Sequence, residues 1–360
     1  MDFASEEISL NDSIETVNDW FYDQGWTDGL PIIPPTSERV GKLLAWTDRD
    51  PQDELGAMPP KYGIATAEKL AINAVMAGCV PEYFPVIIAA VEALLDESFN
   101  LYGVQSTTHP CAPLLIMNGP IAAEIGVNAG YNAFGQGWRP NATIGRAIRL
   151  ALLNIGGATP GGLDRSTQGQ PSKYSYCIAE NEEENPWGPL HVELGFGAQT
   201  STVTVCGAEG PHNINDHISS AAPGILTTIA TTMAGMGSNN AYAFGEPILA
   251  LGPEHAAILA RDGLSKGDIR AYVFEHARVP RDKWETGGMI GMGFTPDHAF
   301  SNEDAIPLIR KPDRLMIIVV GGPGRHSCWM PTFGAMTRSV TRQIVRRDGT
   351  PATSIQEFRR

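Results

Sequence analysis

The stretch LMIIVVGGPGRHSCWM (315–330) decides the fold class, because an apolar run passes directly into a turn rich in glycine and proline. The run is short enough for a buried strand, and the glycines end it. Three other runs have the same form: PLLIMNGP (113–120), STVTVCGAEGP (201–211) and PILALGP (247–253). Four such strands that alternate with helical segments predict an α/β fold with one or more largely parallel sheets.

The order of these segments suggests that the chain contains the same unit twice. Expected helices surround the second and fourth quoted strands in the same order: 66–78, 81–97, 121–127 and 143–155, then 213–221, 223–237, 254–263 and 266–277. We therefore predict an internal duplication with the site between its two halves. The alternative is that two βα units resemble each other only because such units share a pattern. The predicted parts are an N-terminal arm and helix (1–55), a first α/β repeat with an acidic covering loop (56–200), and a second α/β repeat that carries the quoted turn (201–360).

Composition limits the classes of function. The 360 residues carry a formal net charge of −14, which argues against nucleic acid as a partner. The five cysteines are scattered without a Cys-x-x-Cys pair, as is typical of free thiols in a reducing compartment. The acidic N-terminus has no apolar signal region, and no apolar run reaches the length of a membrane span. These features predict a cytoplasmic protein without membrane or nucleic-acid contacts.

The turn of the opening stretch presents Arg325, His326 and Cys328. It lacks the Gly-Lys-Ser/Thr of a phosphate loop, and Ser327 stands where a dinucleotide fingerprint needs its third glycine. A cysteine nucleophile would need its pKa lowered by a cation, a histidine or a helix N-terminus. The alternative is an inert buried thiol beside Trp329.

Two other turns are predicted to meet this one. CGAEGPHNINDH (206–217) carries Glu209 and His212, and Asn118 ends the strand of 113–120. Asn141 and Arg146 open an expected helix, whose N-terminus would favour a carboxylate or phosphate of a ligand. Asn141 is equally suited to be only the N-cap of that helix.

The acidic stretch AENEEENPWGPLH (179–191) is expected to cover the site, and the irregular segment 285–304 is expected to be a second cover. Glu180, Glu182 and His191 suit a general acid–base set or a site for a hard metal ion. The alternative is a solvated acidic loop. Flanking aromatic residues favour a loop that folds inward.

The function that these features predict is that of an enzyme acting on a small polar molecule by acid–base or cysteine chemistry, as a lyase, a hydrolase or a thiol-dependent redox enzyme without a cofactor. The predicted catalytic residues are His326, Cys328, His212, Glu182 and Glu180. The predicted substrate-binding residues are Asn118, Asn141, Arg146, Arg325 and Glu209.

Two alternatives remain at this stage. In the first, a divalent metal is held by His212, His326 and Glu209. In the second, the chain is an auxiliary subunit that binds a small redox partner protein through its aromatic arm. A homodimer is the default expectation for the oligomeric state.

The segments WTDGLPIIPPTSERV (26–40) and AGCVPEYFPVIIAAVEAL (77–94) resemble a poorly characterised bacterial family. That family is associated with UGSC-type (seleno)proteins, which share the Gly-Leu-Pro…Pro-Pro-Thr opening. The resemblance to the family covers most of the chain, whereas only the N-terminal segment matches the UGSC-type proteins. It implies a small thiol protein or selenoprotein as a partner. The Cys-Gly-Ser-Cys motif does not occur in this sequence, and the resemblance assigns no residue a role.

Overall fold

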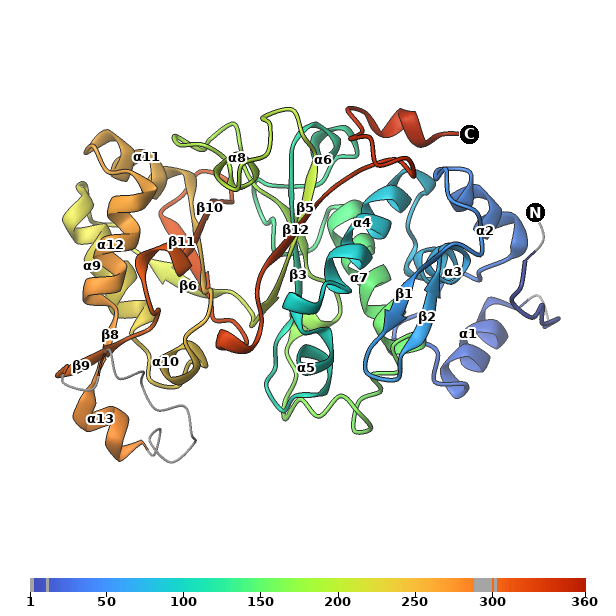
Figure 1. The fold of residues 1–360 in the computed structure, drawn as a ribbon, viewed down its shortest axis with the longest axis horizontal. Helices are drawn as coiled ribbons and strands as arrows, with labels where there is room; N and C mark the ends of the chain where they lie inside the picture. The colour runs from blue at the N-terminus through green and yellow to red at the C-terminus, as the bar shows by residue number, and fades with distance from the viewer. Residues whose placement is uncertain (1–2, 11–12, 288–299, 301–302) are drawn as a thin grey trace.

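The computed structural model describes residues 3–10, 13–287, 300 and 303–360. Its centre consists of two mixed four-stranded sheets that pack face to face (Figure 1). Most of the predicted cover at 285–304 lies outside the described residues. No helix in the described part of the chain is both long and apolar enough to cross a membrane.

The first sheet has the order β12–β5–β3–β4 and consists of β3 (Ala112–Asn118), β4 (Cys177–Ala179), β5 (Thr202–Ala208) and β12 (Val340–Gln343). β3 and β4 are parallel, whereas β5 runs antiparallel to β3 and β12 antiparallel to β5. The second sheet has the order β10–β7–β11–β6 and consists of β6 (His212–Asn215), β7 (Ile248–Leu251), β10 (Met316–Val319) and β11 (His326–Met330). β10 and β7 are parallel, β11 is antiparallel to β7, and β6 is antiparallel to β11.

The two sheets therefore have the same succession of strand directions. Along the chain, β3, β4 and β5 build the first sheet, and the next strand, β6, pairs in the second. In the same way β7, β10 and β11 build the second sheet, and the next strand, β12, returns to the first. Each set of strands thus contributes its last member to the opposite sheet, which ties the two sheets together.

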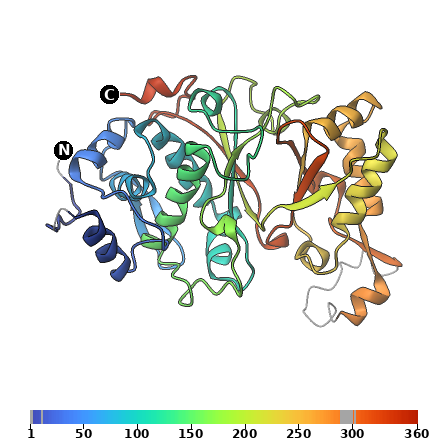
Figure 2. The ribbon, with the colours of Figure 1, turned by 180° about the vertical axis from the view of Figure 1, so that it is seen from behind.

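Helices cover the outer faces of the two sheets, as Figure 2 shows from behind. The first sheet and its N-terminal extension carry α1 (Ile14–Asp23), α2 (Ser37–Leu44), α3 (Ala67–Ala77), α4 (Phe84–Leu94), α5 (Leu101–Ser106), α6 (Pro120–Glu124), α7 (Arg139–Asn154) and α8 (Leu190–Glu193). The second sheet carries α9 (Ala222–Met233), α10 (Asn240–Ala243), α11 (Pro253–Arg261), α12 (Lys266–His276) and α13 (Arg281–Thr286). Two small antiparallel ribbons complete the fold: β1 (Glu54–Met58) with β2 (Gly63–Thr66), and β8 (Arg278–Pro280) with β9 (Ala305–Pro307).

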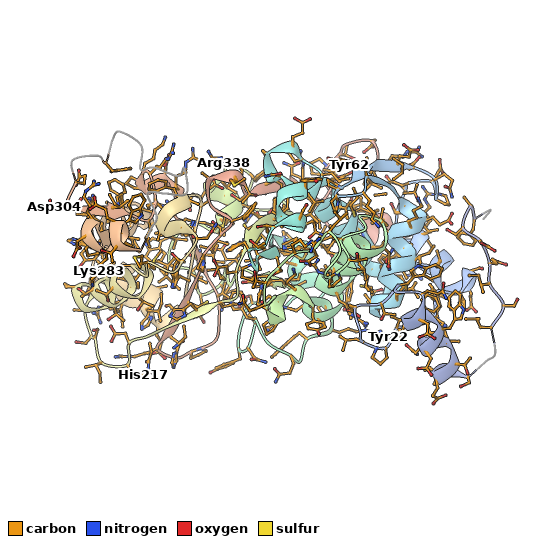
Figure 3. All side chains as sticks on the ribbon, turned by 90° about the horizontal axis from the view of Figure 1, so that it is seen from below. Tyr22, Tyr62, His217, Lys283, Asp304 and Arg338 are labelled. Atoms are coloured by element: carbon orange, nitrogen blue, oxygen red, sulfur yellow. The ribbon has the colours of Figure 1, made fainter. Side chains whose placement is uncertain are left out.

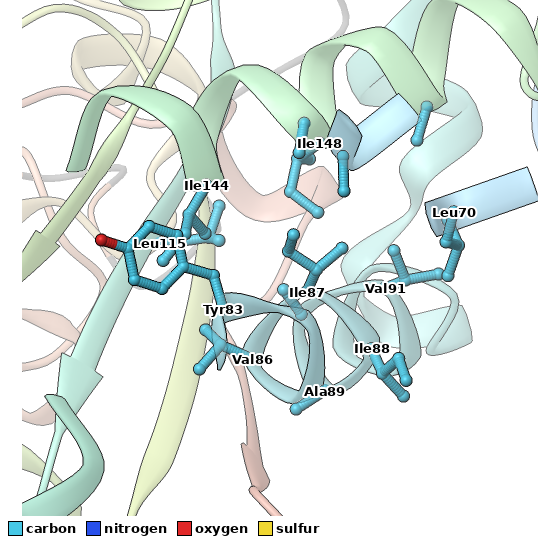
Figure 4. Close-up of a cluster of buried hydrophobic side chains, with 14 of the residues drawn as sticks. Leu70, Tyr83, Val86, Ile87, Ile88, Ala89, Val91, Leu115, Ile144 and Ile148 are labelled. Atoms are coloured by element: carbon cyan, nitrogen blue, oxygen red, sulfur yellow. The ribbon is translucent and has the colours of Figure 1, made fainter. Parts of the chain in front are cut away.

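Three apolar layers hold this arrangement together. Alternate residues of β3 point to opposite faces, so that Leu115 packs on the helices and Ile116 on the other sheet. The outer layer of the first sheet is formed with α3, α4 and α7 (Figure 4). Ile87 of α4 is 1% exposed, and burying a side chain of this kind stabilises the fold by roughly 1.5–3 kcal/mol. A second layer packs α9, α11 and α12 on the second sheet, and the third fills the space between the sheets.

The mixed α/β class is confirmed, but the prediction of largely parallel sheets is wrong, because β5, β11, β6 and β12 run antiparallel to their neighbours. The helix predicted at 213–221 is also wrong, since residues 212–215 form β6, whose Ile214 enters the core. His326 to Trp329 lie in β11 rather than in a turn. β5 follows the predicted boundary at residue 200 and yet pairs with β3.

Candidate active site

The buried carboxyl group of Glu180 lies one residue beyond β4, between the two sheets. Its Oε2 accepts hydrogen bonds from Asn118 Nδ2 and from the backbone N–H of Leu190, both at 2.7 Å. Its Oε1 accepts from Asn185 Nδ2 at 2.9 Å and from the N–H of Val319 in the second sheet at 3.4 Å. Burial raises the pKa of Glu180, although the charge of Lys266 and these N–H donors act in the opposite direction.

Glu182 lies beside Glu180 and is only partly buried. Its Oε1 accepts from the backbone N–H of Gly119 at 2.7 Å and from Asn118 Nδ2 at 2.9 Å. The single amide of Asn118 therefore bridges both carboxyl groups. The side chain of Glu182 is 31% exposed, and no described residue donates a hydrogen bond to its Oε2. One oxygen is thus fixed while the other is free to accept a proton.

The turn after β3 positions the N–H that holds Glu182. Gly119 has a φ of 85°, a conformation that residues with a side chain rarely adopt. A Cβ atom there would lie 2.4 Å from the carbonyl oxygen of Thr200, so the chain also has no room for one. Ser201 Oγ accepts from the N–H of Ile121 at 2.9 Å and fixes the next part of the turn.

Three buried polar atoms beside these carboxyl groups have no hydrogen-bond partner among the described residues: Asn118 Oδ1, His191 Nδ1 and Thr202 Oγ1. Asn118 and Thr202 are direct cross-strand partners on the inner face of the first sheet. His191 Nδ1 lies 3.8 Å from Glu182 Oε1, and its Nε2 lies 3.4 Å from the carbonyl oxygen of Ala198. Buried polar groups are almost always paired in folded proteins, so unpaired ones in one network indicate positions for a ligand or water.

The acidic stretch folds inward and connects the two sheets, as the flanking aromatic residues suggested. The N–H of Asn181 donates to the carbonyl oxygen of Val319 at 2.8 Å, and its Nδ2 donates to that of Gly321 at 3.0 Å. Lys266 Nζ donates to the carbonyl oxygen of Gly188 at 2.9 Å. α6 and α8 lie at this same edge of the molecule, at the top of Figure 1. The cluster therefore lies where the ends of β3, β4 and β10 meet.

Only two of the three turns predicted to meet do so. The acidic stretch connects the two turns, because Glu180 and Glu182 accept from Asn118 and Asn181 donates to Gly321. The turn at 206–212 lies at the opposite end of the first sheet, because β5 is antiparallel to β3 and Ala208 pairs with Ala112. This corrects the prediction that all three turns form one site.

Glu209, predicted to bind the substrate or a metal ion, contacts a histidine of the protein instead. Its Oε1 lies 2.7 Å from Nε2 of His109, whose ring stacks on Phe333. Both residues lie near the first residue of β3, far along the strand from Asn118. Glu209 is therefore separate from the cluster of Asn118, Glu180, Glu182 and His191, which we call the Glu182 cluster.

The three residues proposed as alternative metal ligands are not brought together. His212 pairs in register with Trp329 and His326 with Asn215, so the two histidines lie at opposite ends of the β6–β11 pairing. They also point to opposite faces of the sheet. His212 shares a face with its partner Trp329, and Trp329 lies three positions after His326 on β11, so that it faces the other way. Among the residues that the structure describes, no group of three or more His, Cys, Asp or Glu side chains could hold a metal ion.

The remaining predicted binding residues have protein partners. Arg146 forms a two-pronged ion pair with Asp28, in which both N–O distances are 2.8 Å, and thereby anchors the N-terminal arm. Asn141 bonds to the backbone of Asn128 and Ala133, and Trp138 occupies the N-cap position of α7 instead. Arg325 donates to the carbonyl oxygen of His217 at 3.0 Å.

Cys328 lies on the inner face of β11 and only part of it reaches the surface. Burial raises the pKa of its thiol to about 12, so it is protonated at neutral pH. Burial also raises the pKa values of the other four cysteines, whose side chains are buried. In the part of the chain that the structure describes, burial dominates and nothing lowers the pKa of Cys328.

We therefore expect the native protein to react slowly with a thiol reagent at pH 7–8. In an assay with Ellman's reagent, all five cysteines should react promptly only after denaturation in guanidinium chloride. The native sample should show little reaction over the same minutes, and a Cys328→Ser variant should look the same. One fast equivalent that this substitution removes would contradict the expectation and favour cysteine chemistry.

Sequence reasoning found Asn118, Glu180, Glu182 and His191 but missed Thr202 and Asn185. Thr202 lies inside a strand, where threonine is common, so the sequence around it does not indicate a binding residue. Asn185 lies within the acidic stretch and could have been included as a partner of its carboxyl groups.

No match to the chain was found among family models, curated proteins or solved structures. The resemblance of segments 26–40 and 77–94 to a bacterial family therefore stays a prediction.

Proposed function

We propose that this protein is an enzyme that performs acid–base chemistry on a small polar molecule at the edge where Asn118, Glu182 and His191 meet. One observation carries the proposal. The Asn118 amide holds two carboxyl groups together, while nearby buried atoms of Asn118, His191 and Thr202 have no partner among the described residues.

Each residue has a role that follows from its contacts. Glu182 is the general base, because its Oε1 is fixed by two N–H donors and no described residue donates to its Oε2. Glu180, which is 4% exposed and has donors on both oxygens, positions Asn118 and the acidic stretch. Asn118 Oδ1, His191 Nδ1 and Thr202 Oγ1 are the atoms available to bind the substrate.

This arrangement favours proton abstraction, as in a lyase or isomerase, over thiol chemistry. A carboxylate base and nearby hydrogen-bonding groups suffice for proton transfer at carbon or oxygen. The raised pKa of Cys328 opposes the nucleophilic alternative.

The site lies between two halves that we infer to be an internal duplication. The equal order and directions of the strands in the two sheets support this inference, as does the reciprocal exchange of β6 and β12. In open α/β sheets, ligands bind beyond the carboxyl ends of the parallel strands. The parallel pairs β3–β4 and β10–β7 end at this edge.

The test is an NMR screen in D₂O with pools of small hydroxy acids, amino acids, keto acids and polyols. The wild type should convert one compound or exchange one of its carbon-bound protons, and Glu182→Gln should lose most of this activity. The proposal is wrong if no compound in the pools is altered by the wild type, or if Glu182→Gln acts as fast as the wild type.

A further inference from the structure

A pair of exposed histidines, His217 and His326, lies on the second sheet, away from the Glu182 cluster. Nε2 of His217 and Nε2 of His326 are 3.0 Å apart, and both side chains are exposed. The rings lie nearly edge to face, at 79°, with their centroids 4.7 Å apart. His326 begins β11 and His217 follows β6, and these two strands pair with each other. Figure 3 shows His217 at the outer edge of the molecule.

We propose that His217 and His326 form a surface site for a divalent transition metal ion of the copper or nickel type, in which water fills the remaining coordination positions. This site shares only His326 with the metal site considered from the sequence. It is independent of the acid–base function proposed above.

The hydrogen bonds prepare His326 as a ligand. Its Nδ1 lies 2.9 Å from Asn213 Oδ1, so the Nδ1–H donates to the amide oxygen and Nε2 carries a lone pair. This is the arrangement that orients histidine ligands in metal sites. Without a metal, His217 Nε2–H donates to His326 Nε2. With a metal, the proton of His217 sits on Nδ1, and both Nε2 atoms face the ion.

The distance is compatible with an ion bound by both nitrogen atoms. Two nitrogen atoms that are 3.0 Å apart, each about 2.0–2.1 Å from an ion, subtend an angle of about 91–97°. That angle fits neighbouring positions of a square-planar or octahedral ion such as Cu²⁺ or Ni²⁺. A tetrahedral Zn²⁺ site requires a wider separation of about 3.3 Å.

The surrounding charges permit a cation. Arg325 precedes His326 in sequence, and its guanidinium lies 3.4 Å from Glu254 Oε2 and donates to the carbonyl oxygens of His217 and Ser219. The whole chain has a formal net charge of −14, which also favours the approach of cations.

The test is calorimetric titration of the protein, without a histidine tag, with Ni²⁺ and with glycine-buffered Cu²⁺. We expect one tight equivalent per chain, and at least tenfold weaker binding in His217→Ala and in His326→Ala. Asn213→Ala should also weaken binding by about tenfold or more, because it removes the group that orients His326. The matched control is His212→Ala, which should bind as the wild type does, since this histidine is exposed on β6 but faces the other side of the sheet.

A second readout identifies the ligands directly. The electron paramagnetic resonance spectrum of the Cu²⁺ protein should show coupling to two imidazole nitrogens, and the His217→Ala spectrum to one. Because both side chains are exposed, the variants should keep the circular dichroism spectrum of the wild type. The proposal is overturned if the wild type binds no metal, or if the double variant His217→Ala/His326→Ala binds as the wild type does.

Discussion

The Glu182→Gln variant is expected to turn over the substrate about 10²- to 10⁴-fold more slowly than the wild type, which is the usual contribution of a positioned general base. Glutamine keeps the size of the side chain, and its carbonyl oxygen can still accept from the N–H of Gly119 and from Asn118 Nδ2. It cannot take up a proton. The loss should therefore appear in kcat, with KM changed little.

The matched control is Glu183→Gln, which alters the neighbouring carboxylate on the same stretch. Glu183 is exposed and forms no hydrogen bond or ion pair with a described residue, so its variant should retain the kcat of the wild type. Steady-state kinetics on the compound found by the NMR screen would measure both variants. Equal losses in the two variants would show that the net charge of the stretch matters rather than a base at position 182.

The free energy of unfolding separates chemistry from folding. Glu182 is partly exposed and Glu182→Gln retains its acceptor oxygen, so we expect a stability within about 1 kcal/mol of the wild type. A large drop in stability together with the loss of activity would assign Glu182 a structural role instead.

The sequence predicted β3, β5, β7, β10 and most of the longer helices because each one leaves a local pattern. The apolar runs around Leu115 and Leu249, for example, are strands as predicted. Four strands of the two central sheets were missed or misplaced, and two of them, β6 and β11, contain polar residues. Their pairing depends on partners about 100 residues away in sequence, and local patterns do not record such contacts.

The site was predicted in part for the same reason. Glu180 and Glu182 lie two positions apart in sequence, and Asn118 ends a clearly apolar strand, so the local sequence was enough to predict them as site residues. It could not place Glu209, because strand direction decides at which end of the sheet a turn lies, and β5 is antiparallel to β3. Nor could it pair His326 with His217, which are 109 positions apart.

Replacing Glu180 by alanine is expected to lower the free energy of unfolding by about 2–5 kcal/mol. The substitution leaves the buried backbone N–H groups of Leu190 and Val319 without their hydrogen-bond acceptor. Each unsatisfied N–H group lowers the free energy of unfolding by about 1–3 kcal/mol. It also releases Asn118 and Asn185 from one of their partners. Urea unfolding followed by circular dichroism would measure the change, with Glu183→Ala as the exposed control. A loss below about 1 kcal/mol would mean that water replaces the carboxyl group without cost.

The pH dependence of the free energy of unfolding reveals the charge of Glu180. Burial raises its pKa above the ordinary value of 4.5, so the folded state binds this proton more tightly than the unfolded state does. The contribution of Glu180 to stability is then fully present below pH 4.5 and declines as the pH rises through the folded-state pKa. The free energy of unfolding of the wild type, relative to that of Glu180→Gln, should therefore fall as the pH rises above 4.5. A rise over that range would show that the N–H donors around the carboxylate outweigh its burial, and that Glu180 is ionised when it holds Asn118.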